Sequence, residues 1–265
     1  FLWTRFVAHE HGPHSPQALD AERAERALCT AADMTVGTTA EMVEDLAWRY
    51  GLDPTRAVVI PNYVLTDRPE SDEAREEGLV LYAGQLVARK RVDLLIEAIA
   101  IVAEGGRKVQ LEITGDGPEL RRLKALAAER NAPVNFRPRI PHDQLLERMR
   151  RCSLYAQASE LEGHPKTVIE AMASGAPVLV ANATGLAGVV THGSNGLRVE
   201  PAVHAIAHAM EELLADADWR DSLGAAAART ARAAYGLPGI VERELAVHRA
   251  AVEQGQLRPR LRATA

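Results

Sequence analysis

The sequence predicts an α/β fold with a doubly wound, parallel, Rossmann-like sheet and a remnant of a second α/β domain. From Gly78 onward, short apolar runs alternate with segments of helical periodicity. Aromatic residues make up only 4% of the chain, so the core must consist of Ala, Val, Leu and Ile, which suits buried parallel strands. The 265 residues suffice for one large domain, or for one full domain plus part of another.

The first half of the main region predicts three strand–helix units. GLVLYAG (78–84) is a continuous apolar run typical of a buried strand, and 91–105 has apolar residues at helical spacing, ending at Gly105 and Gly106. KVQLEITG (108–115) predicts the next strand, and a helix over 118–130 would have Pro118 at its first position. A short strand at 134–136 and a helix at 141–151 follow.

The second half continues the alternation and ends in helices. SLYAQAS (153–159) predicts a strand, 165–174 a helix ended by Gly175, and APVLVA (176–181) and GLRV (196–199) two more strands. Helical patterns then cover 202–216, 218–234 and 238–253. This alternation predicts βαβ units with right-handed crossovers. We therefore expect a complete nucleotide-binding-sized domain over 78–235, then a C-terminal helix and tail over 236–265.

The first 77 residues predict a smaller and incomplete set of elements. Helices are expected at 18–33 and 39–51, and short strands at 34–37 and 57–60. Two short strands and two helices cannot close a doubly wound domain alone, so we interpret 1–65 as the remnant of a domain. Residues 66–77 (TDRPESDEAREE) are polar and charged and predict a linker.

Charge and cysteine content exclude several classes of partner and site. The net charge of −5 gives no electrostatic reason to expect a nucleic-acid partner. Cys29 and Cys152 fit no metal or redox spacing and predict a reducing cytoplasm, and we expect no metal and no cofactor. No apolar run approaches the ~20 residues that span a bilayer. The first residue is Phe, so we expect a piece of a longer reading frame or a processed product.

In an open α/β sheet, ligands bind beyond the carboxyl ends of the strands, so the loops there carry the candidate site. In AGQLVARKR, Gly84 would let a ligand approach the backbone, and Arg89, Lys90 and Arg91 would attract an anion before the next helix. A solvated basic helix start is the alternative. TGDGPEL carries a G-x-G signal that a tight turn explains by itself, and no dinucleotide or P-loop fingerprint accompanies it.

The segment SELEGHPKTVIEAMASGAPVLV (159–180) places seven residues between Glu162 and Glu170. Gly163 and Pro165 predict a turn and a helix start, and the first amide groups of that helix favour a phosphate. On a 3.6-residue period Glu170 shares a helix face with Thr167, so its carboxylate should border the crevice and accept hydrogen bonds from sugar hydroxyls. The alternatives are the surface of an amphipathic helix for Glu170 and a solvated loop carboxylate for Glu162.

This segment resembles the E-x7-E segment of the retaining family-4 glycosyltransferases with the GT-B fold, whose pattern is close to E-G-x-P-x-x-x-x-E-A-M-A-x-G-x-P-V. YAGQLVARKRVDLLIEA (82–98) looks like that family's G-R-L-x-x-x-K-G-x-x-x-L-I-x-A segment, and LEITGDGPELRRL (111–123) like its G-x-G-P segment. The resemblance covers about residues 30–250. It implies that 78–235 is the donor-binding half of an enzyme that transfers a sugar, with retention, from a nucleotide-diphosphate sugar to an unknown acceptor (a glycan, a lipid or a small molecule).

The resemblance also implies roles for individual residues. Lys90 would contact the diphosphate, Glu170 the ribose hydroxyls and Glu162 the hydroxyls of the transferred sugar, so Lys90 and Glu162 would carry the catalytic roles. His164 would contact sugar or phosphate, or else pack within the loop. The implied donor-binding residues are Gly84, Gln85, Arg89, Lys90, Gly115, Gly117, Arg139, Ile140, Glu162, Gly163, His164, Pro165, Lys166, Thr167 and Glu170.

The sequence departs from the family pattern in ways that affect the donor site. Gln85 stands where the family has Arg, which removes one cation, and Pro138 stands where the family usually has Gly, near the base. The front of the N-terminal domain, which supplies the acceptor site and any peripheral membrane contact, lies outside the resemblance. The alternative functions are a non-catalytic nucleotide-sugar-binding module and a GT-B epimerase or phosphorylase.

The remaining histidines predict no site. His9, His11 and His14 are interpreted as chain-end residues, because none aligns with the family's histidine near the reaction centre. HAIAH (204–208) has zinc-compatible i, i+4 spacing but no following Glu and no third ligand, so a helix-surface pair is expected.

Overall fold

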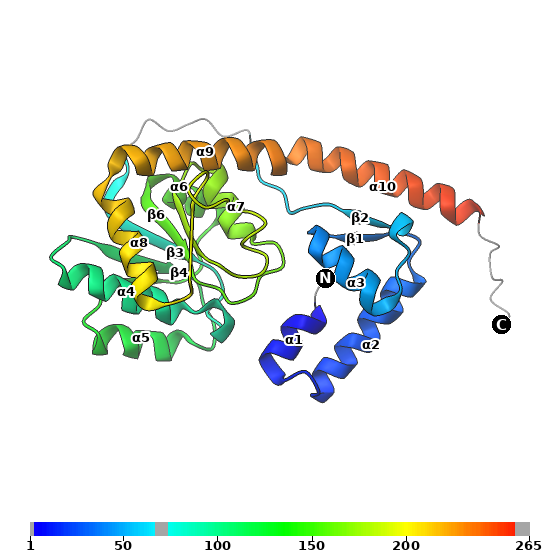
Figure 1. Cartoon of the computed structure of the whole chain (residues 1–265), viewed down its shortest axis with the longest axis horizontal. Coiled ribbons are helices and arrows are strands. Elements are labelled where there is room, and N and C mark those ends of the chain that lie inside the picture. Colours follow the sequence, from blue (N-terminus) through cyan, green and yellow to red (C-terminus); the bar gives the residue numbers. More distant parts are fainter. Residues whose placement is uncertain (1–2, 67–73, 258–265) are drawn as a thin grey trace. The chain divides into compact units, whose positions relative to one another are not determined.

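The computed structural model describes residues 3–66 and 74–257, which divide into two compact units (Figure 1). One unit comprises Phe1–Tyr63 and Leu237–Ala265, and the other Val64–Gly236. Most of the predicted linker 66–77 lies outside the described residues. Its last two residues, Glu76 and Glu77, belong to a strand rather than to a linker.

The larger unit contains six parallel strands in the order β5-β4-β3-β6-β7-β8. This arrangement confirms the predicted α/β class with a Rossmann-like sheet. The strands run β3→β4→β5 towards one edge and β6→β7→β8 towards the other, so the order reverses between β3 and β6. Ligand crevices form at such a reversal, beyond the carboxyl ends of the two strands. The strands are β3 (Glu76–Ala83), β4 (Gln110–Thr114), β5 (Val134–Arg137), β6 (Cys152–Gln157), β7 (Val178–Ala181) and β8 (Leu197–Val199).

Helices cover both faces of this sheet, as Figure 1 shows. Along β3, Val80 and Tyr82 point into one core and Leu79, Leu81 and Ala83 into the other, because successive strand side chains alternate. A strand buried on both faces must be apolar throughout, which explains the GLVLYA run. The first core is covered by α4 (Val92–Glu104), α5 (Leu120–Glu129) and α8 (Val203–Ala215), and the second by α6 (His142–Arg151), α7 (Lys166–Ala173) and most of α9 (Ala217–Tyr235).

The smaller unit pairs β1 (Thr35–Gly37) with β2 (Ala57–Val59) in parallel. Its core is made by Cys29, Met42, Leu46, Tyr50 and Leu52. The other elements of the unit are α1 (Trp3–His11), α2 (Pro16–Ala31), α3 (Ala40–Tyr50), the 3-10 turn η1 (Pro54–Arg56) and α10 (Leu237–Leu257).

Two local expectations were wrong. The sequence did not predict α1, because a nine-residue helix is too short to be stable without tertiary packing. The packing comes from α2: the Thr4 hydroxyl donates to the buried Glu25 carboxylate at 2.6 Å, and the Tyr50 hydroxyl donates to the same oxygen at 2.8 Å. Pro118 is not at the first position of a helix, since α5 begins at Leu120.

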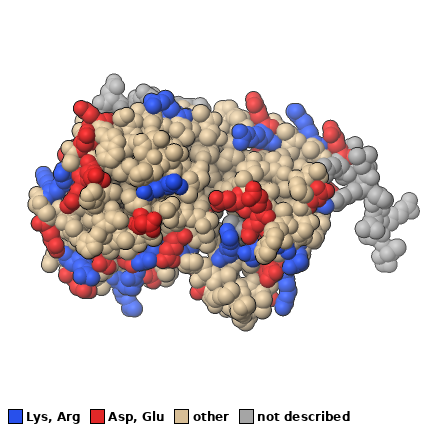
Figure 2. Space-filling view, in the orientation of Figure 1, with Lys and Arg blue, Asp and Glu red and all other residues tan. Residues whose placement is uncertain are grey.

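Both cysteine thiols lie inside the protein, and the surface carries charges of both signs. Cys29 and Cys152 are both free and buried, and burial raises the pKa of Cys152 to about 12. Lys and Arg side chains are interspersed with Asp and Glu on the face seen in Figure 2. Within residues 3–66 and 74–257, every helix is too short or too polar to cross a membrane.

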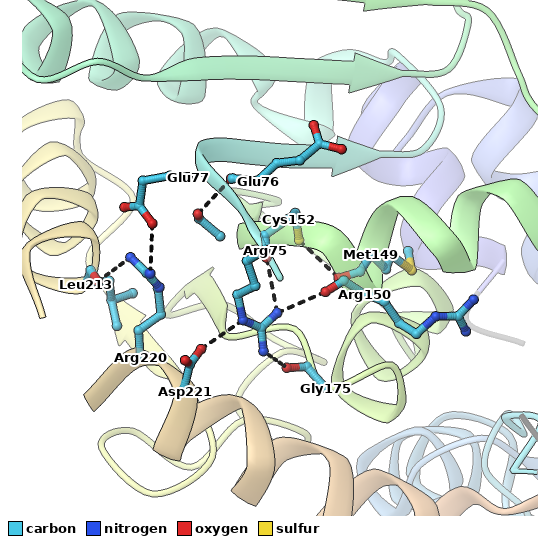
Figure 3. Close-up of polar contacts among 11 residues, drawn as sticks. Arg75, Glu76, Glu77, Met149, Arg150, Cys152, Gly175, Leu213, Arg220 and Asp221 are labelled. Carbon is cyan, nitrogen blue, oxygen red and sulfur yellow. Dashed lines mark hydrogen bonds and ion pairs between the residues drawn. The ribbon is translucent and has the colours of Figure 1, made fainter. Parts of the chain in front are cut away.

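Arg75, just before β3, ties several elements together at the amino edge of the sheet (Figure 3). Its guanidinium donates to the carbonyl oxygens of Arg150 and Cys152, each at 3.1 Å, and of Gly175 at 2.7 Å. It also pairs with Asp221 at 2.8 Å. The Arg150 carbonyl belongs to the last turn of α6 and the Gly175 carbonyl follows α7, so the cation sits where helix ends are partly negative. This contact fixes the far end of the helix that carries Glu170.

We predict that Arg75→Gln lowers the free energy of unfolding by about 2–4 kcal/mol, because the carbonyl oxygens lose a charged donor. Urea unfolding measures the change. The matched control is Arg23→Gln, whose side chain is 78% exposed and pairs only at the surface with Asp20, and which should change stability by less than about 0.5 kcal/mol. Equal effects of the two substitutions would contradict a clamping role for Arg75.

Candidate functional site

The loops that follow β3 and β6 meet where the strand order reverses, and each contributes a charged group. Lys90 lies in the 3-10 turn Ala88–Lys90 after β3, and Glu162 lies in the loop after β6. Lys90 Nζ is 2.5 Å from Glu162 Oε1, and Arg89 Nη1 is 3.7 Å from Glu162 Oε2. The Glu162 side chain is only 8% exposed, so its interpretation as a solvated loop carboxylate was wrong.

Hydrogen bonds to backbone carbonyl oxygens join the two loops. The Glu160 amide donates to the Arg89 carbonyl oxygen at 2.9 Å, and Arg89 Nη1 donates to the Leu161 carbonyl oxygen at 3.2 Å. Arg91, which stands at the Gly of the family pattern, has a left-handed φ of 46° and pairs with Glu160 at 2.7 Å. A left-handed residue other than glycine persists only where its surroundings enforce it. The Arg91 side chain is therefore held at the junction of the two loops by Glu160, whereas the Arg89 side chain lies beside Glu162.

Glu162 is also fixed from the opposite side. Its amide donates to the Thr184 carbonyl oxygen at 3.0 Å. Gly185 has φ 83°, and a Cβ atom there would lie 2.2 Å from the Glu162 carbonyl oxygen. This close approach requires glycine at position 185, and it holds the Glu162 backbone next to the loop after β7.

Burial dominates the electrostatics of the pair. It lowers the pKa of Lys90 below the usual lysine value, and the neighbouring Glu162 carboxylate opposes that shift. Burial likewise raises the pKa of Tyr82 in β3 and of Tyr155 in β6. An ammonium group can donate three hydrogen bonds, so Lys90 can hold Glu162 and an anionic ligand at the same time.

A cavity of about 280 Å³ opens between the carboxyl ends of β3 and β4 and the first turns of α6 and α7, and Lys90 and Glu162 are not among the residues that line it. The glycine after β4 is required there, since a Cβ atom on Gly115 would lie 1.9 Å from the Gly84 carbonyl oxygen. Six predicted site residues line the cavity. They are Gly84, Gln85, Gly115, Arg139, Ile140 and Thr167, and the other lining residues are Ala83, Thr114, His142 and Leu145.

Glu170 lies on the inner side of α7 and is 6% exposed, so the alternative of an amphipathic helix surface was wrong. His142 Nε2, from the first turn of α6, is 2.9 Å from Glu170 Oε1, and Lys166 Nζ is 3.8 Å from the same oxygen. Pro165 is the N-cap of α7 and no side chain caps that end. The first amides of α7 therefore remain suited to an anion, and Gly163 lies in the turn that leads to them.

Some predicted residues have other roles in the structure. A Cβ atom on Gly117 would lie 2.3 Å from the Leu86 carbonyl oxygen, so this glycine serves the packing of two loops. The His164 ring packs edge-on against Tyr235 with centroids 5.1 Å apart. His208 pairs at the helix surface with Glu212 at 3.3 Å. Over the described part of the chain, no group of three or more His, Cys, Asp or Glu residues could hold a metal ion.

Sequence reasoning missed two polar residues of the site. Gln157 ends β6, is 1% exposed and donates to Glu162 Oε1 at 2.7 Å. His142 contacts Glu170 from a helix whose start lies in a loop already assigned to the site. An amide at the carboxyl end of an otherwise apolar strand was the available signal for Gln157, whereas no local pattern indicates the contact of His142.

The sequence model of the family described as Glycosyl transferases group 1 matches residues 65–230. The chain belongs to this family. The match spans all six strands of the larger unit and both loops that carry the ion pair.

Individual relatives agree with this assignment. A D-inositol 3-phosphate glycosyltransferase from Nocardia farcinica is 33% identical over 230 residues, which are 80% of this chain and 48% of that protein. The chain spans about half the length of the curated relatives it matches. The structure of S. aureus TarM superposes with a TM-score of 0.79 at 20% identity, covering 86% of this chain and 46% of that one. Anabaena Alr3699/HepE superposes with a TM-score of 0.79 at 19% identity, covering 87% and 67%.

The position of His164 predicts a pH-dependent stability. Burial lowers the pKa of His164 to about 4, from an ordinary value of 6.5. Between these values the unfolded chain holds a proton at this residue and the folded chain does not. The stability contribution is therefore fully present above pH 6.5 and is lost as the pH falls towards 4.

We predict that His164→Phe keeps the ring packing on Tyr235 and reduces the loss of unfolding free energy between pH 7 and pH 5 by roughly 1 kcal/mol, after allowance for solvent screening. Chemical denaturation at the two pH values measures this difference. His204→Phe, at an exposed helix position, is the matched control. An unchanged pH dependence in His164→Phe would show that this histidine titrates alike in the folded and unfolded chain.

Proposed function

We propose that the larger unit is the donor-binding half of a retaining, family-4-type glycosyltransferase that uses a nucleotide-diphosphate sugar. The observation that carries the proposal is the buried Lys90–Glu162 pair at the strand-order reversal, at the same edge of the sheet as the cavity and the first turn of α7. A buried pair of opposite charge offers a cation to a diphosphate and an acceptor to sugar hydroxyls in one place. Family membership supports glycosyl transfer as the reaction class.

The donor is proposed to lie along the carboxyl edge of the sheet. The nucleoside would occupy the cavity, with its ribose hydroxyls donating to Glu170, which at present contacts His142. The diphosphate would lie between Lys90 and the uncapped start of α7, where ammonium and amide groups both favour negative charge. The sugar would then lie beside Glu162, whose Oε2 faces Arg89 at the longer distance of 3.7 Å.

The proposed chemistry uses these groups to stabilise the leaving group. The acceptor hydroxyl attacks the anomeric carbon from the face that the diphosphate leaves, the bond between this carbon and the phosphate oxygen breaks, and the hydroxyl proton passes to that oxygen. Configuration is thereby retained. Negative charge grows on the leaving diphosphate in the transition state, so preorganised cations and amides there lower the barrier. Glu162 would hold the sugar in place during transfer.

Structural neighbours guide the choice of donor probe. The Anabaena Alr3699/HepE structure is a complex with UDP and glucose, and the TarM structure also contains UDP. At 19–20% identity these likenesses extend to the fold alone, so UDP is the first probe and GDP and ADP belong in the same panel.

We predict that Glu170→Gln lowers the affinity for the preferred nucleoside diphosphate by about 10- to 100-fold, since a hydroxyl loses a charged acceptor. Isothermal titration without acceptor measures this. Glu129→Gln, at an exposed position of α5, is the matched control and should bind like the wild type. Unchanged affinity in Glu170→Gln would refute the ribose assignment.

We predict that Glu162→Gln slows hydrolysis or transfer of the donor sugar by at least about 100-fold, because the neutral amide holds the sugar hydroxyls and Lys90 less strongly. Release of nucleoside diphosphate from the donor measures the rate. Glu129→Gln, at an exposed position of α5, is the matched control and should stay within about threefold of the wild type.

The second candidate function is a non-catalytic nucleotide-sugar-binding module, and the observation in its favour is that Gln85, which lines the cavity, stands where the family pattern has an Arg that would supply a cation. The two assays above distinguish it. Tight donor binding without any release of nucleoside diphosphate by the wild type favours the module, whereas slow release favours a transferase.

A further inference from the structure

We propose that Gln157 is a positioning residue that orients the Glu162 carboxylate towards the donor sugar. The inference rests on the proposed function of Glu162 and adds a residue that the motif comparison did not contain. Gln157 is the last residue of β6 and is 1% exposed, so its amide must satisfy its hydrogen bonds within the protein.

The orientation of the Gln157 amide follows from its neighbours. Gln157 Nε2 lies 2.7 Å from Glu162 Oε1, and because a carboxylate only accepts, the amide nitrogen must face it. Nε2 also lies 3.2 Å from Ser159 Oγ. Gln157 Oε1 accepts from the Thr167 hydroxyl at 3.2 Å. The Tyr155 hydroxyl lies 3.3 Å from the same oxygen and shares its single proton between it and the Ala83 carbonyl oxygen. Because a hydroxyl donor faces Oε1 and a carboxylate acceptor faces Nε2, only one of the two orientations of the Gln157 amide satisfies both contacts.

The contacts of Gln157 reach the three elements that bound the crevice. Thr167 belongs to the first turn of α7 and lines the cavity. The Tyr155 hydroxyl also lies 3.1 Å from the carbonyl oxygen of Ala83, the last residue of β3. Glu162 belongs to the loop after β6. One buried amide therefore connects the strand ends, the start of α7 and the acidic loop.

As a consequence, the two carboxylate oxygens of Glu162 have different partners. Oε1 accepts from both Lys90 Nζ and Gln157 Nε2, at 2.5 and 2.7 Å. Two short hydrogen bonds to Oε1 fix the orientation of the carboxylate plane. The other oxygen, Oε2, lies 3.7 Å from Arg89 Nη1. Oε2 is therefore the oxygen offered to the sugar hydroxyls. Without Gln157, Lys90 alone would leave rotation about the last side-chain bond of Glu162 much less restricted.

The first test compares two ligands, UDP and UDP-glucose, or the corresponding pair for the base that the nucleotide panel selects. Gln157→Leu removes every hydrogen bond of the amide at nearly constant volume. In this variant the ratio of the Kd for the diphosphate to the Kd for the sugar-bearing ligand should fall by about tenfold or more. The Kd for the diphosphate alone should stay within about threefold of the wild type. A purely structural role would weaken both ligands alike. Gln110→Leu, at the exposed amino end of β4, is the matched control.

The second test uses Gln157→Glu, which keeps the size of the side chain but replaces the donating amide with a carboxyl group. Its ionised carboxylate repels Glu162 and cannot donate. At pH 8 its Kd for the sugar-bearing ligand should be about tenfold or more above that of the wild type, while its Kd for the diphosphate stays within about threefold. A change of less than threefold in the Kd for the sugar-bearing ligand would overturn the positioning role.

The outcomes separate this inference from the proposed function. If Glu162→Gln removes the sugar-dependent affinity and Gln157→Leu does not, the inference is wrong and the donor assignment stands. If Glu162→Gln also leaves that affinity intact, the proposed role of Glu162 fails and the inference fails with it.

Discussion

The buried contact between Lys90 and Glu162 is the interaction on which the proposed donor site depends. It joins the loops after β3 and β6, the two central strands between which the sheet order reverses. Burying one such charge without the other would be strongly unfavourable, so each loop can adopt its position only if the other does. The side chains proposed to act on the donor are therefore also the ones that hold these two loops together.

The surrounding contacts make that arrangement rigid before any ligand arrives. The Glu160 amide and the Arg89 side chain form hydrogen bonds between the two loops. The close approach of Gly185 to the Glu162 carbonyl oxygen fixes the backbone of Glu162. At the opposite edge of the sheet, Arg75 holds the carbonyl oxygens at the ends of α6 and α7. Site precision of this kind is expected when charged groups must meet a developing charge without reorganising.

Much of this architecture could be predicted from the sequence, because its causes are local. Apolar runs and helical periodicity identify all six strands of the larger unit and its helices, and the spacing of Glu162 and Glu170 around a helix start indicates two acidic groups near one crevice. What could not be predicted depends on tertiary contact. Helix α1 forms because Thr4 meets Glu25, and Gln157 and His142 join the site through partners that no spacing reveals. The burial of Glu170 followed only from knowing which side of α7 faces the sheet.

A structure determined with a bound nucleotide-diphosphate sugar tests the central claim most directly. The account predicts that the diphosphate lies within hydrogen-bonding distance of the Lys90 ammonium, that the sugar hydroxyls contact Glu162, and that the nucleoside fills the cavity next to Glu170. A donor bound elsewhere on the molecule, with the Lys90–Glu162 pair unchanged and out of contact with it, would contradict the account.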